Sequence, residues 1–142
     1  MGWNAKNRMT VAMLVALAVL VGAAGVFMPD IRGQLMFKPR QGRAETMVMQ
    51  IAARENRLRK GEGRFDTFAP SQAAAHARAL GLDMQDWPGE DFLFDASLMP
   101  DNSLRLRALP RPDSVRELKV GAQMFVAELA PRGGVNRSGW VP

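Results

Sequence analysis

The stretch MTVAMLVALAVLVGAAGVFM, residues 9–28, is the most informative part of this chain because it contains no charged residue. An α-helix rises about 1.5 Å per residue, so this run has the length to span the roughly 30 Å hydrocarbon core of a bilayer. Lys6 and Arg8 precede the run, and Asp30 and Arg32 follow it. The pattern predicts a transmembrane helix over residues 9–28, between a terminus of residues 1–8 and a domain of residues 29–142.

A cleaved secretory signal is the alternative interpretation of this run, since Val21, Gly22 and Ala23 offer the kind of site that signal peptidase uses. The run is, however, longer than the roughly 7 to 15 residues of a usual signal core. We therefore expect a retained anchor and a mature protein that keeps residues 1–8.

Small residues within the run predict a helix-packing face. Ala18, Gly22 and Gly25 recur at spacings of four and three, where small side chains let a second helix approach closely. The same residues could equally face lipid. Trp3 is expected at the membrane interface, where indole rings concentrate. The expected partners are other membrane protein subunits, reached through this helix, and the lipid bilayer.

The composition limits the remaining possibilities. Lys and Arg number 19 against 14 Asp and Glu, which gives a net charge of +5, but the charges of both signs are interleaved along the chain. A solvated basic surface is the simplest interpretation, so no specific nucleic-acid partner is expected. With no cysteine, the chain has neither disulfides nor thiolate metal sites.

Residues 43–60 have the period of an amphipathic helix, since their apolar residues recur at spacings of three, four and seven. This apolar stripe consists of Ala44, Met47, Val48, Ile51 and Leu58. Glu55 and Arg59 are expected to pair on the solvent side of the helix. Gly61 and Gly63 are expected to end it.

Two prolines lie between the apolar run and the amphipathic helix, so the sequence alone allows two kinds of connection. Pro29 closes that run and Pro39 follows ten residues later. A proline inside a helix removes a backbone hydrogen bond and usually bends the axis. The segment from residue 9 to about residue 60 is therefore either one long kinked helix or two helices joined between residues 29 and 42.

Strand patterns fill the second half of the chain. Alternation over 91–98 and 104–108, with a turn at 100–102, predicts an antiparallel hairpin, and 124–130 predicts a further strand. The residues expected to face the helix are Phe92, Phe94, Leu104, Leu106 and Phe125. A short helix is expected over 71–80, a polar connection over 110–121 and a Gly-rich tail over 131–142. The expected fold is α+β: a long N-terminal helix, transmembrane and then amphipathic, packed on a three- to four-stranded antiparallel sheet within residues 91–130.

This order of elements resembles the type IV pilin and pseudopilin family, in which a long helix leaves the membrane and packs on an antiparallel sheet. The local matches are Met28 and Pro29, Ala53 to Arg57 followed by Gly63, Arg64 and Phe65, Ala79 to Leu82, and Gly139 with Trp140. The processing motif of the family is missing, because residues 7–13 contain neither a glycine nor an acid. The resemblance implies an accessory subunit rather than a major pilin.

No pattern predicts catalysis, a metal or a cofactor. His76 is the chain's one histidine, and catalytic zinc sites need about three protein ligands. The acidic residues Asp83, Asp86, Glu90, Asp91 and Asp95 lack the spacing of a calcium loop. We expect a protein that is not an enzyme, binds no cofactor and has no small-molecule substrate.

Three functions are compatible with these patterns. The first is a non-enzymatic, single-pass subunit of a bacterial inner-membrane complex, with a cytoplasmic N-terminus and a periplasmic domain. The second is a minor pilin or pseudopilin of a type IV pilus or a type II secretion filament. The third is a basic periplasmic binding module for DNA or an anionic polymer.

Overall fold

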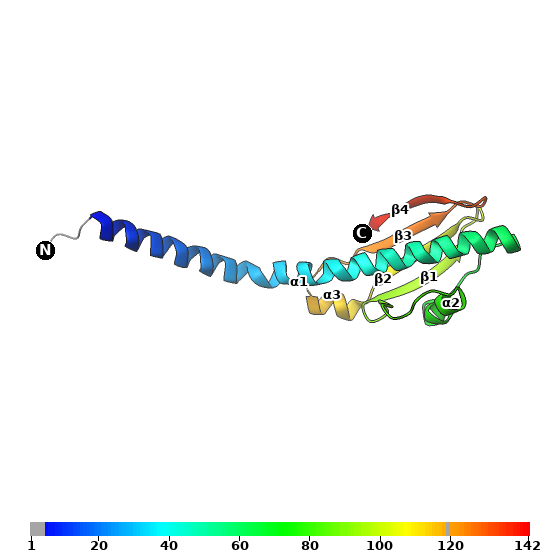
Figure 1. Cartoon of the computed structure of the whole chain (residues 1–142), viewed down its shortest axis with the longest axis horizontal. Helices are drawn as coiled ribbons and strands as arrows, with labels where there is room; N and C mark the ends of the chain where they lie inside the picture. Colours follow the sequence, from blue (N-terminus) through cyan, green and yellow to red (C-terminus); the bar gives the residue numbers. More distant parts are fainter. Residues whose placement is uncertain (1–4, 119) are drawn as a thin grey trace.

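One helix runs through nearly half of the chain and a small antiparallel sheet lies against its second half (Figure 1). The computed structural model describes residues 5–118 and 120–142, with the backbone alone at residues 5, 6 and 21–31. The elements in chain order are α1 (Ala5–Glu62), the 3-10 helix η1 (Pro70–Gln72), α2 (Ala73–Ala79), β1 (Phe92–Leu98), β2 (Leu104–Pro110), α3 (Pro112–Leu118), β3 (Met124–Leu129) and β4 (Val135–Val141).

Helix α1 is continuous through both prolines, so the one-helix alternative describes this chain. The helix ends at Glu62, and Gly63 follows it with a φ of 77°. The N–H of Gly63 donates a hydrogen bond to the carbonyl of Arg59 at 2.7 Å. A glycine in this left-handed conformation is a common helix stop, since it carries no Cβ that would clash.

The sheet is a simple antiparallel meander with the strand order β1-β2-β3-β4. The β1–β2 hairpin lies where the alternation predicted it, with Ala96 opposite Leu106 and Asp95 opposite Arg107. Strand β3 pairs with β2 and then with β4, which places Phe125 opposite Trp140. Each strand therefore turns one set of side chains toward α1 and the other set away from it.

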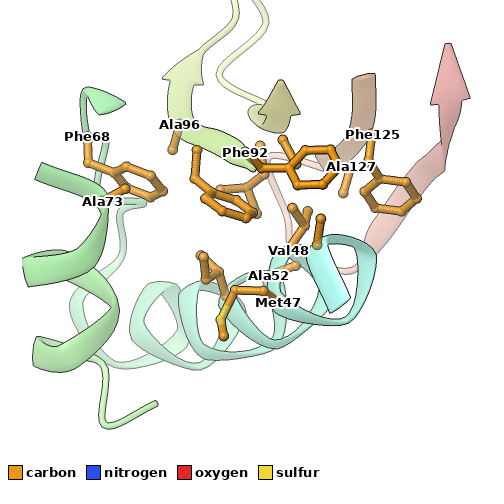
Figure 2. Close-up of a cluster of buried hydrophobic side chains, with 14 of the residues drawn as sticks. Met47, Val48, Ala52, Phe68, Ala73, Phe92, Ala96, Phe125 and Ala127 are labelled. Carbon is orange, nitrogen blue, oxygen red and sulfur yellow. The ribbon is translucent and has the colours of Figure 1, made fainter. Parts of the chain in front are cut away.

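The core lies between α1 and the inner face of the sheet. Figure 2 shows Met47, Val48 and Ala52 of α1 in the same buried cluster as Phe92 and Phe125 of the strands. Of the ten residues expected in this layer, the buried ones are Ala44, Met47, Val48, Ile51, Phe92, Phe94, Leu104, Leu106 and Phe125. Leu58 is half-buried, because it lies near the end of the helix. Phe37 extends the core toward the middle of α1, where its ring stacks on Phe92 at 5.6 Å.

Short segments close the two ends of this layer. Phe68 forms an isolated bridge with Ala96 of β1, and Ala73 and Ala77 bury the inner side of α2. At the other end, α3 meets α1 at Gly33, where an added Cβ would lie 2.0 Å from the carbonyl oxygen of Leu118. Gly33 is thus the point at which α1 leaves the sheet domain.

The structure contradicts the predicted transmembrane helix over residues 9–28. Within the described residues, no helix has the length and apolar content that a membrane crossing requires. Farther along, α1 carries charged residues from Asp30 onward.

The predictions that depended on this span are wrong with it. They are the fold description with a transmembrane helical part, the classification as a single-pass membrane protein, and the inner-membrane location with a cytoplasmic N-terminus and a periplasmic domain. What the structure has instead is an α+β chain with a four-stranded antiparallel sheet, on whose inner face the second half of α1 packs.

Two segments that lack a clear period in the sequence are ordered elements. Residues 112–118 of the expected polar connection form α3, and residues 135–141 of the expected tail form β4. The prediction of an irregular tail is wrong because four of the seven β4 residues are polar or glycine, which hides a period of two. The sheet consequently extends past residue 130 to Val141.

Candidate functional site

The first half of α1 projects away from the sheet domain (Figure 1), and its described side chains over residues 7–20 are exposed. Over residues 9–20 its large apolar side chains are between 42% and 74% exposed. They are Met9, Val11, Met13, Leu14, Val15, Leu17, Val19 and Leu20. Together these side chains form the projecting surface.

The projecting surface surrounds the helix rather than forming one stripe. At 100° per residue, Met13 and Leu17 lie on one side, whereas Val15 and Val19 lie on the opposite side. A helix that is apolar on all sides is stable in water only when it is enclosed. Burying the projecting surface therefore requires contacts on several sides of the helix at once.

The structure describes the predicted helix-packing and interface residues only in part. Ala18 is exposed among the residues of the projecting surface. Gly22 and Gly25 lie in α1, but their surroundings belong to residues 21–31, outside the described side chains. Trp3 lies outside the described residues altogether.

The one histidine forms a hydrogen bond with a buried acidic side chain. Glu55 of α1 has no exposed surface, and its Oε1 lies 2.5 Å from Nε2 of His76 in α2. The backbone N–H of Asp66 donates to the other carboxylate oxygen at 3.1 Å, and the His76 ring stacks on Phe68 at 4.7 Å. The pair ties α1 to α2 and to the segment before it.

The expected Glu55–Arg59 pair on the solvent side is wrong. Glu55 lies seven residues after Val48 and four after Ile51, so the helical period places it on the buried stripe itself. The guanidinium of Arg59 instead lies 5.8 Å from the centre of the Phe65 ring. The spacing of Glu55 from Val48 and Ile51 indicates a buried position, whereas its charge alone favours an exposed one.

The acidic residues singled out in the sequence do not form one site. Asp91 accepts a hydrogen bond from Arg40 of α1 at 2.8 Å and another from Ser114 of α3 at 3.1 Å. Asp95 lies on the outer sheet face, away from α1, and pairs with Arg107. Among the described residues, no group of three or more His, Cys, Asp and Glu side chains is arranged to hold a metal ion.

The outer face of the sheet carries ordered ion pairs. Arg107 binds Asp95 through two nitrogens, and this hydrogen bonding raises the pKa of Arg107 above its ordinary value. Arg105 binds Glu128 on the neighbouring strand through Nε at 3.1 Å and Nη2 at 3.0 Å. These arginines are engaged by carboxylates, which does not favour this face as a surface for nucleic acid.

No family model, no curated protein and no solved structure matches this chain. Its function therefore has to be inferred from its own surfaces and contacts.

Proposed function

We propose that this chain is a non-enzymatic structural subunit that joins a multi-subunit assembly through the projecting surface of α1. The observation that carries the proposal is the apolar circumference of residues 9–20, which nothing in the described chain covers. Burying one such Leu, Val or Met side chain fully contributes about 1.5–3 kcal/mol. Enclosure by several neighbouring chains would therefore stabilise an assembly strongly.

The sheet domain supports this role because it is complete without the projecting half. Its core is covered on the inner face by the second half of α1, and its ends are closed by Phe68 and by α3. The Glu55–His76 pair joins α1 to α2 within this domain. The first half of α1 is thus available for contacts between subunits.

A minor pilin or pseudopilin is the narrower form of this proposal. A projecting helix that continues onto an antiparallel sheet is the plan on which the resemblance to that family rests. The missing processing motif argues for an accessory role. Loss of the first 7 to 8 residues from the native chain, measured by intact mass, would favour this narrower form.

The test uses two double variants of the full-length chain on opposite sides of the helix. Met13→Glu/Leu17→Glu and Val15→Glu/Val19→Glu each place two charges on one side of the projecting surface. Both variants should sediment as smaller species than the original chain, because enclosure involves every side. The matched control is Leu98→Glu, which changes an apolar residue of β1 that is 50% exposed.

Unfolding by urea, followed through tryptophan fluorescence, shows whether the sheet domain stays intact in each variant. Assemblies of unchanged size in both double variants would refute the proposal. Loss of assembly in one double variant only would replace enclosure by a contact with a single neighbour.

A further inference from the structure

The two edges of the sheet differ in whether another segment covers them. At the β1 edge, Phe68 and Ala96 exchange backbone hydrogen bonds of 3.2 and 3.0 Å, so the segment before α2 covers that edge. Strand β4 forms the opposite edge of the sheet. In the described part of the chain, no further segment forms backbone hydrogen bonds along its outer side.

Strand β4 also lacks most of the devices that normally protect an edge. Proteins block such edges with prolines, lysines, bulges or very short strands. The pairing of β4 with β3 is irregular only at its start, between Glu128 and Leu129. From Arg137 to Val141 the register is regular, and Arg137 is the single charged residue there. About 17 Å of regular edge is therefore open to pairing.

We propose that a second copy of this chain adds its own β4 antiparallel to this edge, which joins the two sheets into one of eight strands. In an antiparallel ladder every second residue directs its N–H and C=O to the open side. A two-fold arrangement presents the same groups from both copies and satisfies both edges at once. This contact goes beyond the proposed function and does not rest on it.

The side chains of β4 select one register. Full overlap of residues 137–141 places Gly139 opposite Gly139 of the second copy, Ser138 opposite Trp140, and Arg137 opposite Val141. In this register neither arginine meets the other. A slip that centres the pair on Arg137 would bring two like charges together, which is unfavourable across a strand pair.

Two features of β4 leave room for the second strand in this register. Gly139 has no Cβ, and a glycine inside a strand often marks the close approach of another backbone. Trp140 is already held on the inner face, where its Nε1 donates to Glu45 at 3.1 Å and its ring lies 5.3 Å from Phe125. The residue it would meet, Ser138, is small and exposed.

The two contacts of the molecule do not compete. In Figure 1, β4 runs toward the end of the sheet domain from which α1 projects. A two-fold axis through Gly139 and perpendicular to the sheet would therefore place both α1 helices on the same sheet face, with their projecting halves pointing in opposite directions. The β4 pair and the projecting surface can be engaged at the same time.

The absence of cysteine from the sequence makes a direct cross-linking test possible. In the proposed register, the two Cα atoms of Gly139→Cys lie about 4.5–5.5 Å apart, which is within disulfide range. A Cβ at Gly139 meets nothing within 4 Å in the single chain, so the substitution is compatible with the fold. Full-length Gly139→Cys should form a covalent dimer under mild oxidation, as measured by intact mass.

Ser138→Cys and Arg137→Cys are the matched controls. Their sulfur-bearing residues lie about 7–8 Å and about 14 Å apart in this register, so dimers should form many times more slowly. A dimer of Ser138→Cys or Arg137→Cys that forms faster than that of Gly139→Cys would overturn the register. Equal rates for all three, or no dimer from any, would overturn the contact.

The same measurement in the Met13→Glu/Leu17→Glu background separates this proposal from the previous one. The Gly139→Cys dimer should form at the same rate when the projecting surface is disrupted. A dimer that disappears in that background would show that the strands meet only because the helices associate, and would refute an independent β4 contact.

Discussion

Between Phe37 and the end of α1, apolar residues fall on one stripe that is buried under the sheet, whereas between Met9 and Leu20 they cover the whole circumference and remain exposed. The backbone is helical in both halves. The distribution of apolar residues around the axis therefore decides what each half contacts. A single sheet can bury one apolar stripe, whereas a helix that is apolar on all sides needs several neighbours to bury it.

The largest expected effect comes from removing His76, the hydrogen-bond partner of the buried Glu55 side chain in the packed half of α1. His76→Ala leaves the Glu55 carboxylate, which has no exposed surface, with only the N–H of Asp66 as a partner. Removing one member of a buried pair costs about 3–5 kcal/mol. Urea unfolding should show this loss, and Arg78→Ala, on the exposed side of the same helix α2, should leave the free energy of unfolding nearly unchanged.

A compensating variant tests the cause of that loss. In Glu55→Met/His76→Leu the buried carboxylate is absent, so most of the stability should return. If the double variant is as unstable as His76→Ala, the loss comes from packing around α2 and not from an unpaired charge.

A second prediction compares the two halves of α1 directly. Ile51→Ala removes a side chain that is 1% exposed and should lower the free energy of unfolding by about 2–5 kcal/mol. Leu17→Ala removes one that is 59% exposed in the projecting half. Under conditions that keep the chain monomeric, this change should leave urea unfolding within about 0.5 kcal/mol of the original value. Equal losses would mean that the projecting half is packed in the single chain.

The regular parts of the sheet domain could be predicted because their periods are clean. Phe92, Phe94, Leu104 and Leu106 alternate with polar residues and are buried in the hairpin. Strand β4 could not be predicted because Asn136, Ser138 and Gly139 hide its alternation, and its pairing depends on β3 rather than on local preference. Helix α3 spans only seven residues, too short for a period to distinguish it from a loop.

The candidate site was predictable in part, at the level of composition. The apolar run over residues 9–28 was evident, and the interpretation as a membrane span is the part that the structure contradicts. Hydropathy indicates that a segment is favoured in an apolar environment, but it does not identify the partner that provides this environment. The buried Glu55 was recoverable from its spacing with Val48 and Ile51, but its partner His76 comes from another helix and could not be identified without the fold.

A third prediction sharpens the boundary between the two halves. Gly33→Ala places a Cβ against the carbonyl oxygen of Leu118, so α3 has to shift, at a cost of about 1–3 kcal/mol. Hydrogen exchange should speed up at the amides of α3. The matched control is Gly42→Ala, whose Cβ meets nothing within 4 Å and which should stabilise the helix by roughly 0.5–1 kcal/mol. Unchanged exchange in α3 would mean that α1 and α3 are not in contact at Gly33.

The smallest expected effect lies in the β1–β2 turn, away from both halves of α1. The hydroxyl of Ser103 donates to Oδ1 of Asp101, and so does its backbone N–H, at 3.0 Å. These bonds, with the hydroxyl first, lower the pKa of Asp101 below the ordinary value of 3.8. A carboxyl group whose pKa is lower in the folded chain stabilises the fold above its unfolded pKa, and this contribution is lost as the pH falls through the folded pKa.

Asp101→Asn should therefore be slightly less stable than the original chain at neutral pH, and the difference should shrink as the pH is lowered below 3.8. Urea unfolding at the two pH values measures it. Because Asp101 is exposed, the effect should be well below those of Ile51→Ala and Gly33→Ala, and high salt should weaken it further. Asp86→Asn, an exposed acid outside the turn, controls for the general effect of removing a negative charge. A difference for Asp101→Asn that persists unchanged at low pH would assign the turn's stability to the shape of residue 101 rather than to its charge.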